Sequence, residues 1–484
     1  MKRLIAIITE SYASPLPWWV LALLVTSLPM IKICKTKDTE LIAGLELAFF
    51  RGEPKLLDPH NLSFVSEYYL LENLSAGLVF EGWQSLEHWE PELAKKWELM
   101  PDGAWTFYLP QCNFWSDGTP ITLEQIAAHF RRLRESPSRH LSLLKKISAI
   151  DLDSKNNALS FRFSVPITEG LLHELSLADA ALLHPKNLEG DWSITSGAYY
   201  VSSQTPEYFQ LKANPHFVKR ATIDAVRVYP PTAQNIKIDV LRRPAQAFSP
   251  EIASLYREAE HVLKGYPTLI YYFHFPKTDP RSQDPETRRA FQGFIRQAFA
   301  NFKHPDILEF ENQLIPRGFS GRLKTAPGEK AMDFRKLQGQ PLQIELREKL
   351  KSSFPDLLFA EARKHNIELK IVYTPHTAHT FAAFANFVGN QRDPLSSWRF
   401  LYGEGGPLHR FYPQVEKLFE AISSARADHR KERLLELHRL TLEQTYAAPF
   451  MAEYVAILSS QRVDLSALNP FDMRLRFFEM RWQP

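Results

Sequence analysis

Two Asp-Gly turns bracket an alternating segment between Trp97 and Gln125, and this segment limits the possible folds more than any other part of the chain. Asp102-Gly103 can supply the two positive-φ positions of a tight hairpin turn. After that turn every second side chain is large and apolar, and these side chains share one face because strand side chains alternate in direction. The segment therefore predicts a strand whose apolar face carries Trp105, Phe107 and Leu109.

The second turn, Asp117-Gly118-Thr119-Pro120, ends this sheet and leads into a helix. Thr122 and Gln125 stand three residues apart, which is the spacing of a capping box at a helix start. We expect the helix to bury Ile126, Ala127 and Phe130 and to end in a solvated run of arginines.

Short motifs surround this segment in a fixed order. They are Leu57-Asp58-Pro59-His60-Asn61, Glu90-Pro91-Glu92-Leu93-Ala94, Trp105-Thr106-Phe107, Phe114 to Thr122, and Thr195-Ser196-Gly197-Ala198-Tyr199. This set resembles the family 5 extracellular solute-binding proteins, which are the peptide-type receptors of ABC importers. The likeness covers the chain after residue 38 and weakens toward the C-terminus.

The length of 484 residues is too great for a single core and suggests two or three lobes. The resemblance implies an α/β fold, namely the bilobal periplasmic-binding-protein fold of class II type, hinged, with an additional small subdomain. The expected parts are a signal peptide or membrane anchor (1–38), a discontinuous first lobe (39–65, 188–264 and 450–484), the small subdomain (66–187) and a second lobe (265–449).

Charge and cysteine content exclude several classes of function. The net charge is only +3, from 58 basic and 55 acidic residues, so nothing indicates a nucleic-acid partner. The two cysteines, Cys34 and Cys112, lie in different contexts, which argues against a disulfide and against a metal site. We expect Cys112 to be a half-buried packing residue.

The N-terminus favours export. Lys2 and Arg3 precede an apolar run from Trp18 to Ile31, whose length suits a signal peptide better than a full membrane span. No small-residue cleavage site follows the run, and Ile33 stands directly before Cys34 where a lipoprotein signal has a small residue. A cleaved leader, lipidation at Cys34 and an uncleaved anchor all stay open.

Several further elements are expected from periodicity. They are a first strand over Leu45–Phe50, a helix through Tyr69, Leu70, Leu74 and Leu78 that ends near Gly82, paired strands at 147–152 and 159–163, a short helix at 169–175, a buried strand at 269–275, a parallel β-α-β unit over 342–372, and two helices at 415–424 and 429–446. The resemblance to the family implies a further helix that starts at Asp284.

No reactive constellation appears in the sequence. There is no G-x-S-x-G motif and no His-Glu-x-x-His motif, and Gly403-Glu404-Gly405-Gly406 lacks the lysine of a phosphate loop. His376 and His379 have no adjacent third ligand. We therefore expect no enzyme activity, no cofactor and no metal.

The resemblance implies a ligand cleft bordered by the Asp58-Pro59-His60 loop and by the strand that starts at Phe384. In oligopeptide-binding relatives this strand pairs with the extended peptide, and an aspartate three residues before the acidic residue of a Glu/Asp-Pro pair holds the peptide's α-ammonium. Asn390 occupies that position here and offers only a dipole, so a free peptide N-terminus is held less firmly. The candidate ligand-binding residues are Phe50, Arg51, Tyr272, His274, Phe387, Gly389, Asn390, Arg392 and Asp393.

We interpret the chain as a periplasmic or extracytoplasmic solute-binding protein that closes by a hinge motion on a peptide-like solute and delivers it to an ABC transporter permease. We expect a monomer, and membrane attachment through the N-terminal segment stays open. One alternative is a non-peptide solute. Another is a regulatory sensor, which would need a DNA-binding motif that the 38 apolar-rich residues before the domain do not supply.

Overall fold

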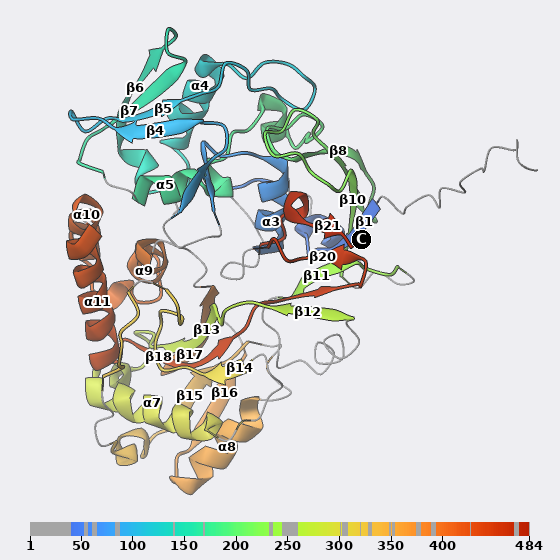
Figure 1. Cartoon of the computed structure of the whole chain (residues 1–484). Coiled ribbons are helices and arrows are strands. Elements are labelled where there is room, and N and C mark those ends of the chain that lie inside the picture. Colours follow the sequence, from blue (N-terminus) through green and yellow to red (C-terminus); the bar gives the residue numbers. More distant parts are fainter. Residues whose placement is uncertain are drawn as a thin grey trace, which may run out of the picture. The chain divides into compact units, whose positions relative to one another are not determined.

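The computed structural model describes residues 40–52, 57–60, 65–82, 88–138, 141–167, 170–231, 236–243, 260–300, 302, 308–319, 321–327, 332–347, 350, 354–373, 379–388, 394–425, 427–468 and 474–483. They belong to one compact unit, Glu40–Pro484. The predicted leader and Cys34 lie outside the described residues. Figure 1 shows the arrangement of the elements.

The largest sheet has seven strands, and its central strand β1 (Glu40–Gly44) runs parallel to both of its neighbours. The order is β12 (His261–Lys264), β19 (Ala456–Ser459), β11 (Val240–Arg243), β1, β10 (Ala225–Tyr229), β9 (Phe209–Ala213) and β8 (Tyr199–Gln204). The other pairs are antiparallel. This sheet thus joins strands from three distant parts of the sequence.

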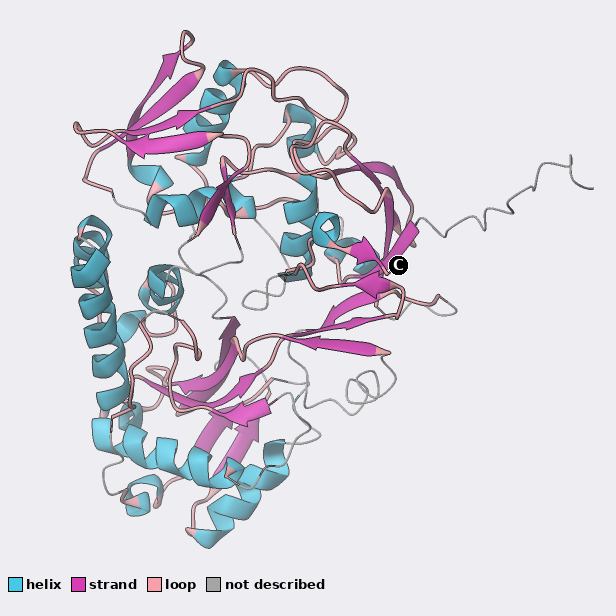
Figure 2. Cartoon of the chain, in the orientation of Figure 1, coloured by secondary structure: helices cyan, strands magenta, loops and turns pink. Residues whose placement is uncertain are grey.

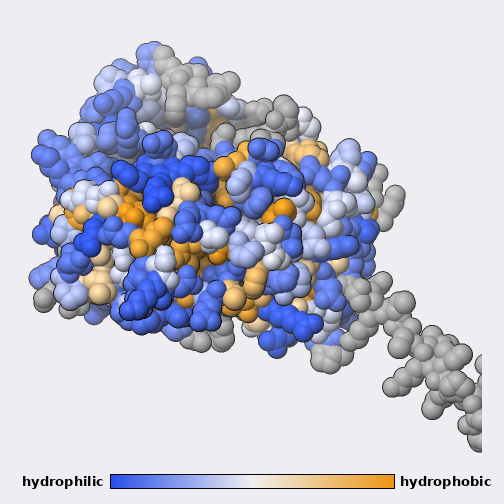
Figure 3. Space-filling model, turned by 90° about the horizontal axis from the view of Figure 1, so that it is seen from above, coloured by the Kyte–Doolittle hydropathy of each residue, from blue (hydrophilic) through white to orange (hydrophobic). Residues whose placement is uncertain are grey.

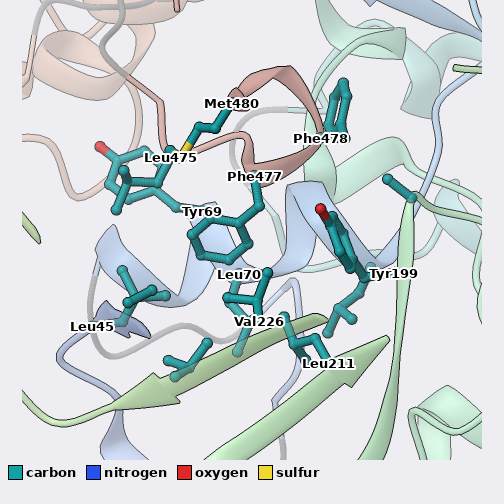
Figure 4. Packing of buried hydrophobic residues seen from close by; sticks show 14 of the residues in the cluster. Leu45, Tyr69, Leu70, Tyr199, Leu211, Val226, Leu475, Phe477, Phe478 and Met480 are labelled. Carbon is teal, nitrogen blue, oxygen red and sulfur yellow. The ribbon is translucent and has the colours of Figure 1, made fainter. Parts of the chain in front are cut away.

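Helix α3 (Val65–Leu74) and the C-terminal segment pack on this sheet and complete its core. Asn73 joins the two, because its Nδ2 donates to the Leu475 carbonyl at 2.7 Å and its Oδ1 accepts from the Phe477 amide at 2.8 Å. Figure 4 shows side chains from α3, the strands and the C-terminal segment meeting in one apolar cluster. The last described residues are therefore part of the core.

The second sheet has six strands between two helical layers (Figure 2). Its order is β14 (Leu308–Phe310), β18 (Ala447–Glu453), β13 (Leu269–His274), β17 (Ala382–Val388), β15 (Leu342–Glu345) and β16 (Leu369–Val372). Alternate residues of β13 share one core with α7 (Pro285–Phe299) and α8 (Phe354–Lys364). The others share a core with α9 (Pro394–Tyr402), α10 (Val415–Ser424) and α11 (Ala427–Glu443). This burial on both faces explains the continuous apolar sequence of β13.

A four-stranded antiparallel sheet contains the segment with the two Asp-Gly turns. Its order is β4 (Lys96–Leu99), β5 (Trp105–Tyr108), β7 (Ala158–Phe163) and β6 (Ile147–Asp153), and α4 (Leu123–Leu133) covers one face. The predicted capping box is confirmed, with Thr122 and Gln125 bonding each other's backbone amides. Trp105 and Phe107 are buried beneath α4, as predicted. The remaining elements are α5 (Gly170–Leu175) and the pairs β2 (Val79–Glu81) with β3 (Trp89–Pro91) and β20 (Val463–Asp464) with β21 (Arg481–Trp482).

Other local predictions are also confirmed. Strands β6 and β7 pair around a polar turn, and Asp284 caps α7 by accepting the amides of Glu286 and Thr287. Strands β15 and β16 are parallel and joined through α8. The predicted lobe boundaries stay predictions, although α3 packs in the same core as the seven-stranded sheet.

The predicted first strand over Leu45–Phe50 is wrong. The strand lies earlier, at β1, and Ala48–Arg51 form a 3-10 helix that ends at Gly52 in the left-handed conformation. A contact distant in sequence stabilises this turn, because the carboxylate of Glu67 accepts the Ala48 amide at 2.9 Å. The hydrophobic periodicity of residues 45–50 could not predict this contact with Glu67.

The predicted helix through Leu78 to Gly82 is wrong in its second half. It ends at Leu74, and the residues of β2 pair with β3 in a short antiparallel ladder. Cys112 is exposed rather than half-buried, because it lies in the loop after β5 and not in the sheet.

The molecular face in Figure 3 is mostly hydrophilic, with hydrophobic residues gathered in a smaller area. In the part of the chain that the structure describes, no helix combines the length and apolar character needed to cross a membrane.

Candidate functional site

The C-terminal half of β17 has a neighbouring strand on one side only, among the described residues. Strand β13 pairs with it from Ala383 to Val388, whereas the parallel pairing with β15 covers only Ala382 and Ala383. The backbone amides and carbonyls that face away from β13 after Ala383 therefore form a sheet edge. Such an edge can pair with an extended chain.

Five of the predicted ligand-binding residues belong to this strand or follow it. The backbone of Phe387 lies opposite Ile270 in the ladder with β13. Gly389, Asn390, Arg392 and Asp393 lie outside the described residues, between the end of β17 and the start of α9. Their contact with a ligand stays a prediction.

Tyr272 and His274 lie on β13, beside β17. Their register partners on β17 are Ala385 and Ala383. Tyr272 is only 1% exposed and shares the core with helices α9 to α11, and this burial raises the pKa of its hydroxyl. His274 is half-buried at the strand end. The sheet thus brings the backbones of both residues close to Phe387, while the Tyr272 side chain is buried in the core.

Phe50 and Arg51 lie with the other large sheet. The ring of Phe50 packs edge-on against Phe49 and Phe209, and the exposed guanidinium of Arg51 pairs with Glu46. The structure therefore divides the predicted residues into two groups. One belongs to the seven-stranded sheet and the other to the six-stranded sheet.

Two further candidates, Arg347 and Asn386, were not predicted. They lie at or just beyond the carboxyl ends of the parallel strands β15 and β17, where open α/β sheets bind ligands. The guanidinium carbon of Arg347 is 5.8 Å from the ring centre of Phe384, and burial lowers the pKa of Arg347. The side-chain oxygen of Asn386 is buried without a hydrogen-bond partner among the described residues. In the sequence, the polar Asn386 within an otherwise apolar strand was the feature that could have indicated this site.

Metal chemistry finds no support in the described residues, which contain no group of three or more His, Cys, Asp or Glu side chains able to hold an ion. Several buried ionisable groups are instead paired within the fold. An example is Glu311, whose carboxylate lies 2.8 Å from the guanidinium of Arg322.

Residues 88–299 match the model of the bacterial extracellular solute-binding proteins, family 5 middle region. The matched residues include the four-stranded sheet and strand β13. The match covers less than half of the chain, and over these residues the chain resembles the family 5 bacterial extracellular solute-binding proteins. The predicted resemblance to this family is thereby confirmed.

The chain is 35% identical over 84 residues to the periplasmic oligopeptide-binding protein OppA of Salmonella typhimurium. The match covers 17% of this chain and 15% of the length of OppA. The curated relative is thus matched over much less than its full length.

Solved structures match over most of the chain. The dipeptide binding protein from Pseudoalteromonas sp. SM9913 in complex with Met-Leu has a TM-score of 0.74 at 15% identity, with 92% of this chain and 100% of that chain covered. AgaA from A. tumefaciens R10 in complex with agropinic acid has a TM-score of 0.72 at 17% identity, with 92% and 99% covered. The predicted bilobal fold is confirmed. The relatives are binding proteins rather than enzymes.

Proposed function

We propose that this protein captures a peptide-like solute between its two lobes and delivers it to an ABC transporter permease. The observation that carries the proposal is the sheet edge on β17 after Ala383. Its backbone groups can bond the backbone of an extended peptide whatever its side chains are, which suits a receptor for many sequences. The complex of a structural relative with Met-Leu also supports this ligand class.

Native mass spectrometry of the protein purified from its source tests the proposal. We expect an adduct with the mass of a short peptide, which collision-induced release and fragmentation would sequence. A ligand of any other chemistry would contradict the peptide assignment. A ligand-free protein that also fails to take up peptides from a protein digest would contradict capture itself.

A non-peptide solute is the second candidate, and two observations favour it. Asn390 stands where the oligopeptide receptors have an ammonium-binding carboxylate, and a structural relative holds agropinic acid. Asn390→Asp distinguishes the candidates by calorimetry with the co-purified ligand. With a free peptide amine the new charge should tighten binding about ten- to a hundredfold.

Without that amine the buried carboxylate would lack a partner, and binding should weaken. We expect weakening. Tighter binding would contradict the non-peptide candidate, and equal affinities would show that Asn390 does not contact the ligand.

We further propose that the bulk of the protein is exported, in accord with the extracellular family, and that it acts as a monomer. Residues 1–45 fused to an enzyme that is active only outside the cytoplasm should give active enzyme. A silent fusion, with the same enzyme active behind a known export signal, would contradict export.

A further inference from the structure

Helix α5 of the small subdomain (66–187) contacts helix α9 of the second lobe (265–449) through two buried charged side chains. Nη1 of Arg399 lies 3.5 Å from Oε1 of Glu174. The side chains are 13% and 2% exposed, respectively. Water therefore screens this pair much less than a surface ion pair.

The carboxylate of Glu174 is already held in place by its own subdomain. It accepts the backbone amides of Leu143 at 2.8 Å and Leu144 at 3.0 Å, and the hydroxyl of Ser142 at 2.9 Å. These three donors remain hydrogen-bonded to the carboxylate whether or not Arg399 is in contact. Glu174 thus has partners in its own subdomain besides the arginine.

Helix α5 is also anchored on its other side. Nδ1 of His173 lies 3.6 Å from Oε1 of Glu81, and both side chains are at most 1% exposed. Oε2 of Glu81 lies 3.2 Å from Nη2 of the buried Arg474 in the C-terminal segment. The short helix that carries Glu174 therefore has little freedom to move.

Arg399 is connected to the predicted ligand residues by a single helix. Helix α9 starts at Pro394, directly after the predicted ligand-binding turn. Its residues Leu395, Trp398 and Tyr402 are fully buried in the core of the second lobe. Helix α9 therefore holds Arg399 in a well-packed part of the second lobe.

Two contacts at the same interface are more peripheral. Nζ of Lys146 lies 3.2 Å from Oε1 of Glu420, with both side chains more than a third exposed at 41% and 53%. A Cβ added to Gly170 would lie 3.2 Å from Nη2 of Arg430 on α11, so the two elements approach closely there. The buried pair between Glu174 and Arg399 lies with these contacts where α5 meets α9 and α11 and where the 3-10 turn Leu144–Lys146 meets α10.

We propose that Glu174 and Arg399 form a latch that holds the small subdomain against the second lobe and thereby favours the closed arrangement of the protein. The proposal rests on the proposed function, because closure on a ligand gives the latch its role. A contact made only in the closed state shifts the equilibrium toward that state and raises ligand affinity by the same free energy.

Charge reversal tests the latch without any ligand. Arg399→Glu places a carboxylate next to Glu174, and we expect a larger radius of gyration by small-angle X-ray scattering, with the closed-to-open ratio reduced about tenfold. Arg399→Met removes the charge but keeps the side-chain length and should give a smaller increase. Glu420→Lys reverses a charge at the exposed neighbouring pair and should leave the scattering unchanged.

Hydrogen exchange separates opening from unfolding. The amides of Leu143 and Leu144 should stay protected in Arg399→Met, because Glu174 still accepts them. Unchanged scattering in both Arg399 variants would overturn the latch, and so would loss of protection at these amides. Neither readout needs a ligand, so a failed latch is distinguishable from a failed peptide assignment.

Discussion

At the scale of single residues, Glu92 of the Glu90-to-Ala94 motif has a buried carboxyl group that accepts the Gly77 amide at 2.6 Å. Burial raises its pKa to about 8, against the lowering effects of the Gly77 hydrogen bond and of Lys219 and Arg476. The folded protein therefore holds a proton that the unfolded chain loses above pH 4 to 5. Its contribution to stability is complete below the unfolded pKa and is lost as pH rises through about 8.

We predict that Glu92→Gln flattens the pH dependence of unfolding. The wild type should lose about 1.4 kcal/mol per pH unit from this group between roughly pH 5 and 8, and the variant should lack that slope. Urea denaturation at a series of pH values measures it. The exposed Glu124→Gln serves as the control, and an equal slope in Glu92→Gln and wild type would contradict the assignment.

At the scale of elements, strand β5 has one face in the apolar core and an opposite face that is less deeply buried, with Thr106 at 7% exposure and Tyr108 half-buried. Trp105 is 4% exposed, donates its Nε1–H to the Ile167 carbonyl at 3.1 Å and stacks near Phe107. On the opposite face, Nζ of Lys96 lies 4.2 Å from the ring centre of Tyr108 at the protein surface. Substitutions on the two faces of β5 should therefore change the free energy of unfolding by different amounts.

We predict that Trp105→Ala lowers the free energy of unfolding by about 3 to 5 kcal/mol, because it empties an aromatic core site. Tyr108→Ala on the same strand should cost less than about 1 kcal/mol. Chemical denaturation measures both. Ligand affinity of the folded fraction should change little, and normal stability with lost binding would show that the four-stranded sheet forms part of the pocket.

At the scale of the whole molecule, Asp239 joins three distant segments of the seven-stranded sheet. Its carboxylate accepts the Ile42 amide at 2.9 Å, the Ser460 hydroxyl at 3.0 Å and Nε of Arg462 at 2.6 Å. Its side chain is only 4% exposed. The first described strand and the C-terminal strands are therefore held by one carboxylate.

We predict that Asp239→Ala destabilises the protein by about 3 kcal/mol, because buried donors lose their acceptor. Arg162→Met removes the exposed pairs with Asp102 and Asp151 and should cost less than about 1 kcal/mol. Thermal and urea unfolding measure both changes. Equal effects would show that the number of ion pairs matters here rather than their burial.

The sequence alone determined the features that depend on neighbours a few positions apart. The capping box at Thr122 and the N-cap at Asp284 each need only a local partner, and both are present. The hairpin turn at Asp102-Gly103 is also present, but only Gly103 has the positive φ that was predicted for both residues. The order of the motifs also indicated the resemblance to the family 5 solute-binding proteins, which the match over residues 88–299 confirms. Most of the architecture was therefore accessible before any coordinates.

The tertiary structure decided where buried charges find partners and which strand edge stays open. Asp239 and Arg462 are 223 positions apart, and Glu174 and Arg399 are 225 apart, so periodicity carries no record of either pair. The turn at Ala48 depends in the same way on Glu67. Strand β17 is apolar apart from Asn386, and among the described residues its edge after Ala383 arises because β15 pairs with it only at Ala382 and Ala383. Local patterns fix local conformation, but the solvation of a buried charge and the pairing of a strand are set by chain segments that meet only in the folded state.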